Sequence, residues 1–317
     1  MNKYLSIAIP TYNRSALLNK NLLNIIDELK ETSVAVFISD DSEDYLTKEL
    51  LIELKSKYKN IFYSKNRSSF GHDKNMKKVL YEPESEYVWL LGDAVLIKSG
   101  TIKKILNIIK EHGPELVSFG TPERLTDCKE GIYYNGINIF QNFAWHLTYT
   151  GVTIYSRKIL DKSKDIDLEL YPNFPQIGII FNGLGTNSSL YWAGDSLITG
   201  ARGKQSYWMK DAFKTFLNDW PFSISNLPEA YSHQIKNKVL VSHSLNSRLF
   251  SFRSITKIRM LGGFNLSIFF RYRDLLRDHS IENGVILLFL SIFPRWILRM
   301  IVSIRRMYNK RIKILLR

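Results

Sequence analysis

Polar residues that can bind a ligand follow directly on three short apolar runs near the start of the chain. These groups are Thr11–Arg14, the pair Asp40 and Asp41, and Asp93. A carboxylate can accept hydrogen bonds from ribose hydroxyls or from the imide of a nucleobase. In open α/β sheets, ligands bind outside the carboxyl ends of the strands. If the apolar runs are strands of one sheet, the three groups lie at a single binding edge.

The segments around these residues alternate between strand and helix patterns. Four apolar runs are typical of strands: Ser6–Ile9, Val34–Ile38, Ile61–Tyr63 and Glu86–Leu91. Between them, apolar residues recur at three- and four-residue steps, as at Leu18, Leu22 and Ile25, which is typical of amphipathic helices. Ser15 is expected to cap the first helix through its hydroxyl. The alternation predicts an α/β fold over residues 1–115, with a mostly parallel, Rossmann-like sheet and helices on both faces.

The pattern becomes less regular after residue 115, and it is rich in Tyr, Asn and Gly. Three short segments are typical of strands: Leu116–Phe119, Gly151–Tyr155 and Ser189–Trp192. A helix is expected around Phe174–Leu184, and residues 211–277 have the pattern of increasingly basic helices. No internal repeat or low-complexity linker separates these parts. We therefore expect one domain over residues 1–210 and a basic helical region over 211–317.

Composition excludes several classes of protein. Among the 317 residues, 45% are hydrophobic and 13% aromatic, enough for a sizeable core and too many for a disordered chain. A single cysteine, Cys128, excludes an intramolecular disulfide and a cysteine metal cluster, and it fits a reducing, cytosolic setting. The histidines show no metal-binding spacing, and there is no Walker A or G-x-S-x-G motif. No signal peptide is expected, because Pro10 and Arg14 interrupt the apolar run that follows Lys3.

The net charge of +14 is concentrated at the end of the chain. From Arg248 to Arg317 there are fifteen Lys or Arg residues against three acidic residues, so the first 247 residues carry a net charge of only +2. This asymmetry indicates an acidic partner surface, either a membrane or a nucleic acid.

The segment 285–317 has the pattern of a membrane-associating amphipathic helix. Its mostly apolar run, Val285–Phe293, has nine residues, whereas a membrane-spanning helix needs about 20. Beyond Pro294, basic residues (Arg295, Arg299, Arg306) lie near one helical face. The other face is apolar: Trp296, Ile297, Met300, Ile301 and Ile304. This arrangement favours binding at an anionic membrane surface. The alternative is a C-terminal helix that packs on the domain or on another subunit.

The first of the three ligand-binding groups resembles a known family. Ile9-Pro-Thr-Tyr-Asn-Arg14 is similar to the opening of the family 2 inverting glycosyltransferases, which use nucleotide-sugar donors and have the GT-A fold. The resemblance implies that the donor is bound by these residues: Pro10, Thr11, Tyr12, Asn13, Arg14, Asp40 and Asp41. It also implies that residues 1–115 are the nucleotide-sugar-binding half and residues 116–210 the acceptor half. By itself, each acidic or polar group could equally be an ordinary turn or a helix cap.

Two further segments extend the resemblance. In Gly71-His-Asp-Lys-Asn75, the residues Gly71, Asp73 and Asn75 match a family segment that shapes the donor pocket, and helix capping is the alternative role for both polar side chains. Tyr87-Val-Trp-Leu-Leu-Gly-Asp93 resembles most closely the abequosyl- and rhamnosyltransferase-like branch of surface polysaccharide synthesis, so Gly92 and Asp93 are also expected at the donor.

That branch continues with further acids that bind a divalent metal, whereas this chain continues with Ala94 and Val95. Three interpretations stay open. Asp93 and the donor diphosphate alone hold Mn²⁺ or Mg²⁺. Cationic side chains replace the metal, with Arg14, Lys74 and Arg202 as candidates. Otherwise the protein is a non-catalytic relative.

The general base has no clear match. The family places an acid at the start of a helix, and here Gln176 occupies that position, although an amide cannot take a proton. Glu169, with Asp167 as second candidate, is the nearest upstream carboxylate, and Asp195 is the nearest downstream.

A loop over residues 197–208 resembles a segment that closes over the donor in this branch. Gly200 and Gly203 would allow it to move, and Arg202 and Lys204 could reach phosphate oxygens. An ordinary basic surface loop is the alternative.

The resemblance implies an enzyme that transfers a sugar, with inversion, to a lipid-linked saccharide or cell-surface glycan precursor. The basic tail would hold it at the cytoplasmic face of the cell membrane. One alternative is a non-catalytic glycosyltransferase relative that binds nucleotide or glycan, or partners an active subunit. The other is a nucleic-acid-binding protein, which we do not expect because phosphate binding has no use for the apolar face of the tail.

Overall fold

The computed structural model describes residues 1–121, 124, 127–200, 207–280 and 282–304. The chain divides into two compact units, of which the first comprises Met1–Lys204 and Phe222–Val239 and the second Gln205–Pro221 and Leu240–Arg317. The sequence predicts one boundary, at residue 210. In the structure the chain enters the second unit at residue 205, returns to the first at 222 and enters the second again at 240.

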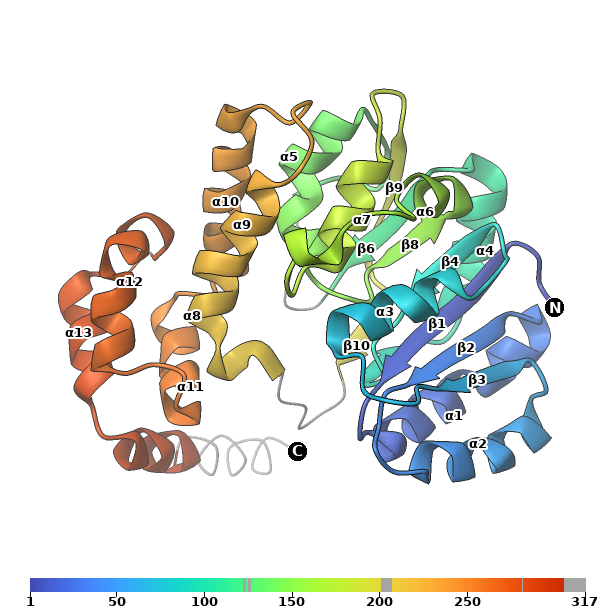
Figure 1. Cartoon of the computed structure of the whole chain (residues 1–317), viewed down its shortest axis with the longest axis horizontal. Helices are drawn as coiled ribbons and strands as arrows, with labels where there is room; N and C mark the ends of the chain where they lie inside the picture. Colours follow the sequence, from blue (N-terminus) through green and yellow to red (C-terminus); the bar gives the residue numbers. More distant parts are fainter. Residues whose placement is uncertain (122–123, 125–126, 201–206, 281, 305–317) are drawn as a thin grey trace, which may run out of the picture. The chain divides into compact units, whose positions relative to one another are not determined.

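The first unit is built on an eight-stranded sheet with the order β3-β2-β1-β4-β8-β6-β9-β7 (Figure 1). The strands are β1 (Leu5–Thr11), β2 (Ala35–Asp40), β3 (Ile61–Lys65), β4 (Tyr87–Leu90), β6 (Leu116–Gly120), β7 (Gly131–Tyr134), β8 (Thr153–Ser156) and β9 (Ser189–Ser196). The neighbours β3-β2-β1-β4 and β6-β9 pair in parallel, while β8 runs antiparallel to β4 and β6, and β7 to β9. The predicted mostly parallel sheet is therefore confirmed.

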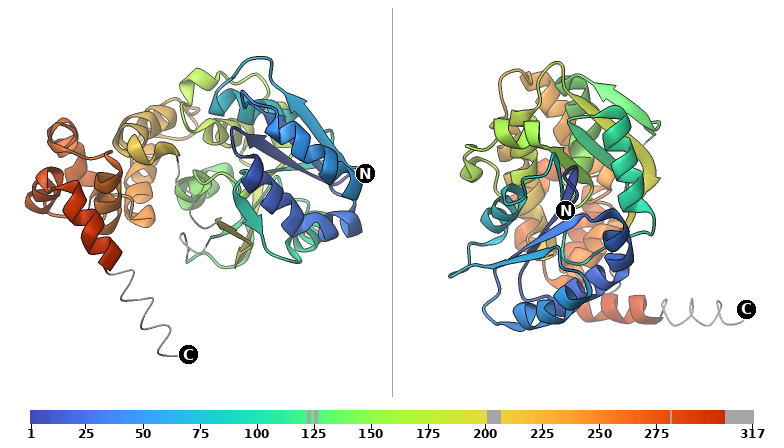
Figure 2. Two further views of the ribbon diagram at one scale, coloured as in Figure 1. Left: turned by 90° about the horizontal axis from the view of Figure 1, so that it is seen from below. Right: turned by 90° about the vertical axis from the view of Figure 1, so that its right-hand side faces the viewer.

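Helices flank this sheet (Figures 1 and 2). They are α1 (Ser15–Thr32), α2 (Leu46–Lys57), α3 (His72–Tyr81), α4 (Thr101–His112), α5 (Gly136–Leu147), α6 (Arg157–Lys162) and α7 (Pro175–Gly183). As predicted, α1 buries the residues spaced at three- and four-residue steps, including Leu18, Leu22 and Ile25. The predicted cap is wrong: Arg14 is the N-cap residue, Ser15 already lies in the helix, and no side chain caps it.

The core explains why the central strands are almost continuously apolar. A parallel sheet covered on both faces leaves no strand face for water, and Leu5, Ile7 and Ile9 of β1 are all fully buried. Trp89 of β4 is also buried, and its indole N–H donates to Gly151 O at 2.9 Å. This packing fixes the end of β4, from which the chain continues to Gly92 and Asp93.

A second, two-stranded sheet follows directly on Asp93. β5 (Val95–Ile97) pairs antiparallel with β10 (Ile198–Gly200). Ala94 and Val95 are both buried, so they serve packing at the position where the resembling branch has acids. The sequence did not predict this pair, because each strand has only three residues and the partners are about a hundred residues apart.

The second unit is helical, as the sequence predicts. Its segments include η2 (Tyr207–Lys210), α8 (Ala212–Lys214), η3 (Thr215–Asp219, a π-helix), α11 (Phe252–Leu261), α12 (Leu266–His279), α13 (Gly284–Ile292) and the helix Arg295–Ile304. Two helices, α9 (Trp220–Ser225) and α10 (His233–Ser247), each contain a point at which the chain passes between units. Stacked rings of Phe213 and Phe264, with centroids 4.9 Å apart, form part of the core of the second unit.

Candidate functional site

Asp93 joins the end of β4 to the loop after β1. Its Oδ2 accepts a hydrogen bond from Thr11 Oγ1 at 3.2 Å, and its Oδ1 lies 3.3 Å from Arg14 Nη1 in an ion pair. The Asp93 and Thr11 side chains are buried, whereas the Arg14 side chain is 32% exposed. Both carboxylate oxygens are thus engaged within the chain, and the guanidinium stands at the solvent side of the pair.

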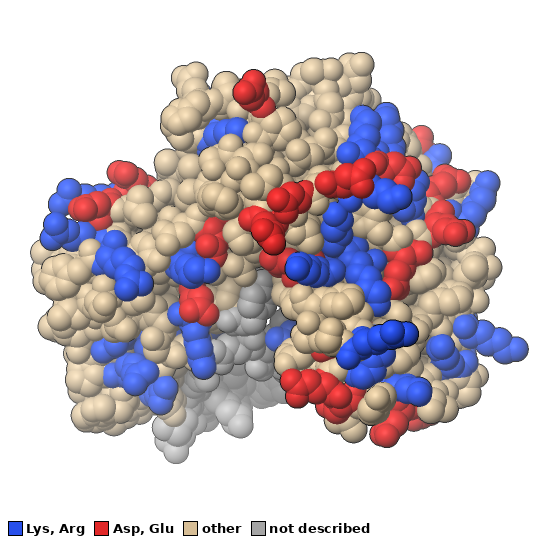
Figure 3. All heavy atoms as spheres, viewed as in Figure 1, with Lys and Arg blue, Asp and Glu red and all other residues tan. Residues whose placement is uncertain are grey.

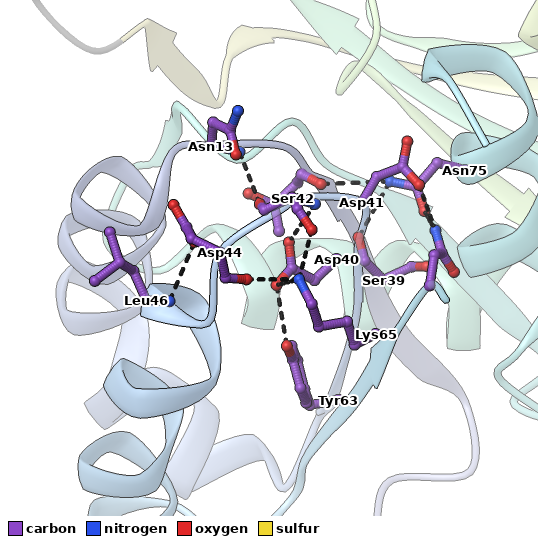
Figure 4. Close-up of polar contacts among 12 residues, drawn as sticks. Asn13, Ser39, Asp40, Asp41, Ser42, Asp44, Leu46, Tyr63, Lys65 and Asn75 are labelled. Carbon is purple, nitrogen blue, oxygen red and sulfur yellow. Dashed lines mark hydrogen bonds and ion pairs between the residues drawn. The ribbon is translucent and has the colours of Figure 1, made fainter. Parts of the chain in front are cut away.

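Asp40, at the end of β2, is fully buried and satisfied by its neighbours (Figure 4). Its Oδ1 accepts from Ser42 N at 2.9 Å and its Oδ2 from the Tyr63 hydroxyl at 3.0 Å, while Lys65 Nζ lies 3.8 Å from Oδ2. Burial, together with the Asp40 carboxylate, raises the pKa of the Tyr63 hydroxyl, so this hydroxyl remains a donor. In this geometry Asp40 shapes the loop that carries Ser42.

Asp41 holds the segment between β3 and α3. Its Oδ1 accepts from Asn66 Nδ2 and Phe70 N, each at 2.8 Å, and its Oδ2 from Ser69 Oγ at 2.7 Å and Gly71 N at 2.9 Å. Burial raises the pKa of Asp41, but the four hydrogen bonds outweigh burial and lower its pKa below the ordinary value. The carboxylate is therefore a fixed negative charge that orders this loop.

Gly71 and Asn75 complete this loop. Gly71 is the N-cap of α3 with φ 77° and ψ 166°, a conformation that is essentially restricted to glycine. The Asn75 amide donates to Ser39 O at 3.2 Å, and its oxygen accepts from Asn66 Nδ2 at 3.1 Å, so one side chain links the ends of β2 and β3 (Figure 4). Neither Asp73 nor Asn75 caps α3. The Asp73 carboxylate instead accepts from Asn173 N at 2.9 Å.

The remaining predicted donor residues lie beside this network. Tyr12 and Asn13 are exposed, and Asn13 N donates to Ser42 Oγ at 2.8 Å. Pro10 and Gly92 are half-buried at the ends of β1 and β4. The structure thus brings together the predicted groups from residues 10–14, 40–41, 71–75 and 92–93. Arg202, Gly203 and Lys204 lie outside the described residues, whereas the start of their predicted loop forms β10 and its end lies in η2.

The structure does not join the predicted bases to this network. Glu169 and Asp167 are exposed, at the short 3-10 helix η1 (Leu168–Leu170), where Asp167 Oδ1 accepts from Glu169 N at 2.9 Å. Asp195 pairs with Lys104 at 3.1 Å. Gln176 is buried at the start of α7, and its Nε2 donates to Thr148 O at 3.1 Å. Its Oε1 has no hydrogen-bond partner among the described residues.

Several residues of the network were not predicted. Lys78 Nζ donates to Ser39 Oγ at 3.2 Å, Ser64 Oγ at 2.9 Å and Asn66 Oδ1 at 2.7 Å, so one ammonium group joins β2, β3 and the loop after β3. Lys65 and Asn66 could have been found from their position, because Lys65 ends β3 and Asn66 follows it, as Asp40 ends β2 and Asp41 follows it. Lys78 gives no such signal, since it lies within α3.

The donor set around Asp93 does not fit a resident divalent metal. Mg²⁺ and Mn²⁺ prefer several oxygen ligands, but Ala94 and Val95 provide none, and Arg14 and Thr11 already use both Asp93 oxygens. Across the described ranges of the chain, no three His, Cys, Asp or Glu side chains are grouped in a way that could hold a metal ion.

The model of the family described as "Glycosyl transferase family 2" matches residues 6–164, just over half of the chain. No curated protein matches. Among solved structures, S. aureus TarS 1-349 is 17% identical with a TM-score of 0.59, over 91% of this chain and 90% of that one. A structure of the same protein in complex with UDP-GlcNAc is 16% identical with the same TM-score and coverage. The mannosyltransferase PcManGT from Pyrobaculum calidifontis, in complex with GDP-Man and Mn²⁺, is 13% identical with a TM-score of 0.56, over 92% and 86%. At these identities the structural likeness shows the fold alone, which is that of GT-A glycosyltransferases.

Proposed function

Because this chain belongs to glycosyl transferase family 2, we propose that it transfers a sugar from a nucleotide-sugar donor bound at the carboxyl ends of β1, β2 and β4. One observation carries the proposal: Arg14, Asp41 and Asp93, far apart in sequence, belong to one polar network at that edge of the sheet. The network runs from the Arg14–Asp93 pair through Thr11, Asn75 and Asn66 to Asp41. Ligands of open α/β sheets bind at this edge. TarS with UDP-GlcNAc and the mannosyltransferase with GDP-Man share the fold, which supports a nucleotide-sugar donor.

The proposed reaction is a single in-line displacement, which inverts the anomeric carbon. The acceptor oxygen forms a bond to that carbon as the bond to the β-phosphate oxygen breaks. The electron pair leaves on the nucleoside diphosphate, and the acceptor proton passes to a general base. Glu169 and Asp167 stay predictions for this base. The diphosphate gains negative charge and must be stabilised. A divalent cation is one means of stabilisation, which the Mn²⁺ in the mannosyltransferase complex supports and the donor set around Asp93 opposes.

The proposed acceptor is a lipid-linked saccharide or a cell-surface polysaccharide precursor. The abequosyl- and rhamnosyltransferase-like branch, and with it capsule or O-antigen synthesis in a bacterium, rests on residues 87–93 alone.

We also propose that the enzyme is peripheral at the cytoplasmic face of the cell membrane. Among the described residues no single helix is long and apolar enough to cross a membrane, and only the pair α13 and Arg295–Ile304, bent by 99°, passes that test jointly. Both helices expose large apolar side chains: Val285, Phe289, Ile292, Trp296, Met300, Ile301 and Ile304. The exposed Arg295 and Arg299 accompany them, as expected of a helix pair that lies in an anionic interface.

A nucleic-acid partner is not expected. In Figure 3 acidic and basic side chains are mixed over the sheet-bearing unit at the right, without a continuous basic field on that face. Nucleic-acid binding depends on such a field. The basic excess of the chain lies after residue 247, where it accompanies the exposed apolar helices.

A non-catalytic relative is the second candidate, and Gln176 favours it. The amide of Gln176 is buried at the position where the family resemblance implies an acid. Such a protein would bind a nucleotide or glycan, or support an active subunit, without turnover.

Calorimetric titration with UDP, GDP, CDP and dTDP tests the proposed donor site. We expect one of the four to bind in preference to the others, and its sugar conjugates then form the panel for transfer assays. Binding without transfer to any acceptor would favour the non-catalytic candidate. If none of the four binds, the proposed function is wrong.

A further inference from the structure

We propose that Arg14, held by Asp93, is the cation that binds the donor diphosphate, so that donor binding and transfer need no divalent metal. This inference rests on the proposed function and identifies how that site stabilises the leaving group. It assigns Asp93 a positioning role instead of metal ligation.

The first argument is the occupancy of the Asp93 carboxylate. Arg14 Nη1 lies 3.3 Å from Oδ1, and Thr11 Oγ1 donates to Oδ2 at 3.2 Å. A metal ion on this carboxylate would have to displace Arg14 or stand beside its positive charge. Ala94 and Val95 supply no side-chain oxygen, so no carboxylate next to Asp93 would offset the repulsion between the metal ion and Arg14.

The second argument is the position of the guanidinium. Arg14 is the N-cap residue of α1, so its backbone is fixed at the carboxyl end of β1, where the polar network lies. Its side chain is 32% exposed, while that of Asp93 is only 6% exposed. The ion pair therefore has its cationic side toward solvent and the carboxylate beneath it.

The third argument is chemical. A guanidinium has five N–H donors in a planar fork, and the contact with Asp93 is made by one nitrogen, so other donors remain for phosphate oxygens. Arginine keeps its charge throughout the reaction. As the anomeric carbon–oxygen bond breaks, its electron pair moves to the β-phosphate, and Arg14 would bind that oxygen more strongly than in the ground state.

The other carboxylates of the site are not available to bind a metal ion together with Asp93. Asp40 is fully buried and accepts from Ser42 N and Tyr63. Asp41 accepts four hydrogen bonds from the segment 66–71. Neither is free to join Asp93 in binding a metal without undoing the loop that it orders.

The test is calorimetric titration of the full chain with the nucleoside diphosphate that binds best, in EDTA and in Mn²⁺. We expect the wild-type affinity to agree within threefold in the two conditions. Arg14→Gln should weaken binding of the nucleoside diphosphate by about 10- to 100-fold, as expected for the loss of a charge-assisted contact. It should weaken binding of the corresponding nucleoside monophosphate by less than about threefold. Arg14→Lys, which keeps the charge without the fork, should be intermediate.

The control is Lys20→Gln, which removes one positive charge from an exposed position on the same helix and should leave affinity unchanged. Asp93→Asn should weaken diphosphate binding equally in EDTA and Mn²⁺, because it releases Arg14. Thermal unfolding of each variant shows whether it is folded.

Metal-dependent binding would overturn the inference while leaving the proposed function intact. In that case EDTA abolishes wild-type binding, Asp93→Asn removes the effect of Mn²⁺, and Arg14→Gln strengthens that effect by freeing the carboxylate. Absence of nucleotide binding by the wild type in both conditions would instead contradict the proposed function itself, and the role of Arg14 with it.

Discussion

Asp41 orders the loop between β3 and α3 at the proposed donor edge of the sheet. Its carboxylate accepts four hydrogen bonds from Asn66, Ser69, Phe70 and Gly71. Two of these donors are backbone amides, which have no other partner in this loop conformation if the carboxylate is lost. The negative charge thus orders the segment that leads into α3, even if it never touches a ligand.

Asp41→Asn should lower the free energy of unfolding by about 2–3 kcal/mol, because one oxygen acceptor becomes an amide donor facing other donors. Since the folded-state pKa of Asp41 lies below its ordinary value, its contribution is complete at neutral pH and is lost as pH falls through that lowered pKa. Urea denaturation at pH 7 and at pH 3 checks both statements. Asp44→Asn, at an exposed acid nearby, is the control. Equal stability of Asp41→Asn and wild type at pH 7 would contradict this role.

Local sequence signals placed the residues of the site but did not reveal their partners. Asp40 and Asp93 were found because each follows an apolar strand. The contact of Asp40 with Tyr63 spans 23 residues, and that of Arg14 with Asp93 spans 79. Periodicity carries no information on such pairs, so the ion pair between Arg14 and Asp93 became visible only in the structure.

At the level of helices and strands, the buried face of α1 was predicted because its apolar residues recur at three- and four-residue steps. The strands β1 to β4 were predicted because each contains a short apolar run. The antiparallel position of β8 between β4 and β6 was not predicted, because the direction of a strand depends on partners that are distant in the sequence. The same holds for β5 with β10. Ser15 was predicted as a cap by residue type alone, although Arg14 takes that position.

His146 ties α5 to β6 and gives this junction a pH dependence. Its ring is fully buried, and Nε2 lies 2.8 Å from Phe119 O. Burial, with the nearby positive charge of Arg124, lowers the pKa of His146 to about 3, although the Phe119 carbonyl opposes the shift. The folded protein therefore keeps this imidazole neutral.

The unfolded chain binds a proton at His146 below about pH 6.5, whereas the folded chain does not until about pH 3. The stabilising contribution is therefore complete above pH 6.5 and falls by about 1.4 kcal/mol for each pH unit below it. Between pH 6.5 and 5, the free energy of unfolding measured by urea denaturation should fall by about 2 kcal/mol less in His146→Gln than in the wild type. The exposed His233→Gln is the control. An equal fall in the free energy of unfolding of the wild type and of His146→Gln would contradict a lowered pKa of His146.

Over the whole molecule, charge and exposed apolar surface meet at the C-terminal helices. Ile292 and Ile301 are 57% and 50% exposed on α13 and on Arg295–Ile304. Because about half of each side chain is already covered, burying the rest in a lipid interface is favourable by about 1 kcal/mol each. Replacing both with Asp should therefore reduce partitioning to vesicles containing anionic lipid by at least about tenfold.

Co-sedimentation with phosphatidylcholine vesicles, with and without phosphatidylglycerol, measures this partitioning. The control is Leu46→Asp together with Ile52→Asp, which adds the same two negative charges at exposed apolar positions on α2. Wild-type binding should require phosphatidylglycerol and weaken with salt. Equal binding by the double variant, or no binding by the wild type, would contradict the membrane proposal.

The most direct test of the donor site is backbone amide hydrogen exchange with and without the nucleoside diphosphate that binds. We predict slower exchange in residues 9–14, 40–42, 66–75 and 91–95, which the structure brings to one edge of the sheet. Peptides from the distant strand β7 should be unchanged. Protection confined to other parts of the chain, with these four segments unaffected, would show that the nucleotide binds elsewhere and would contradict the account.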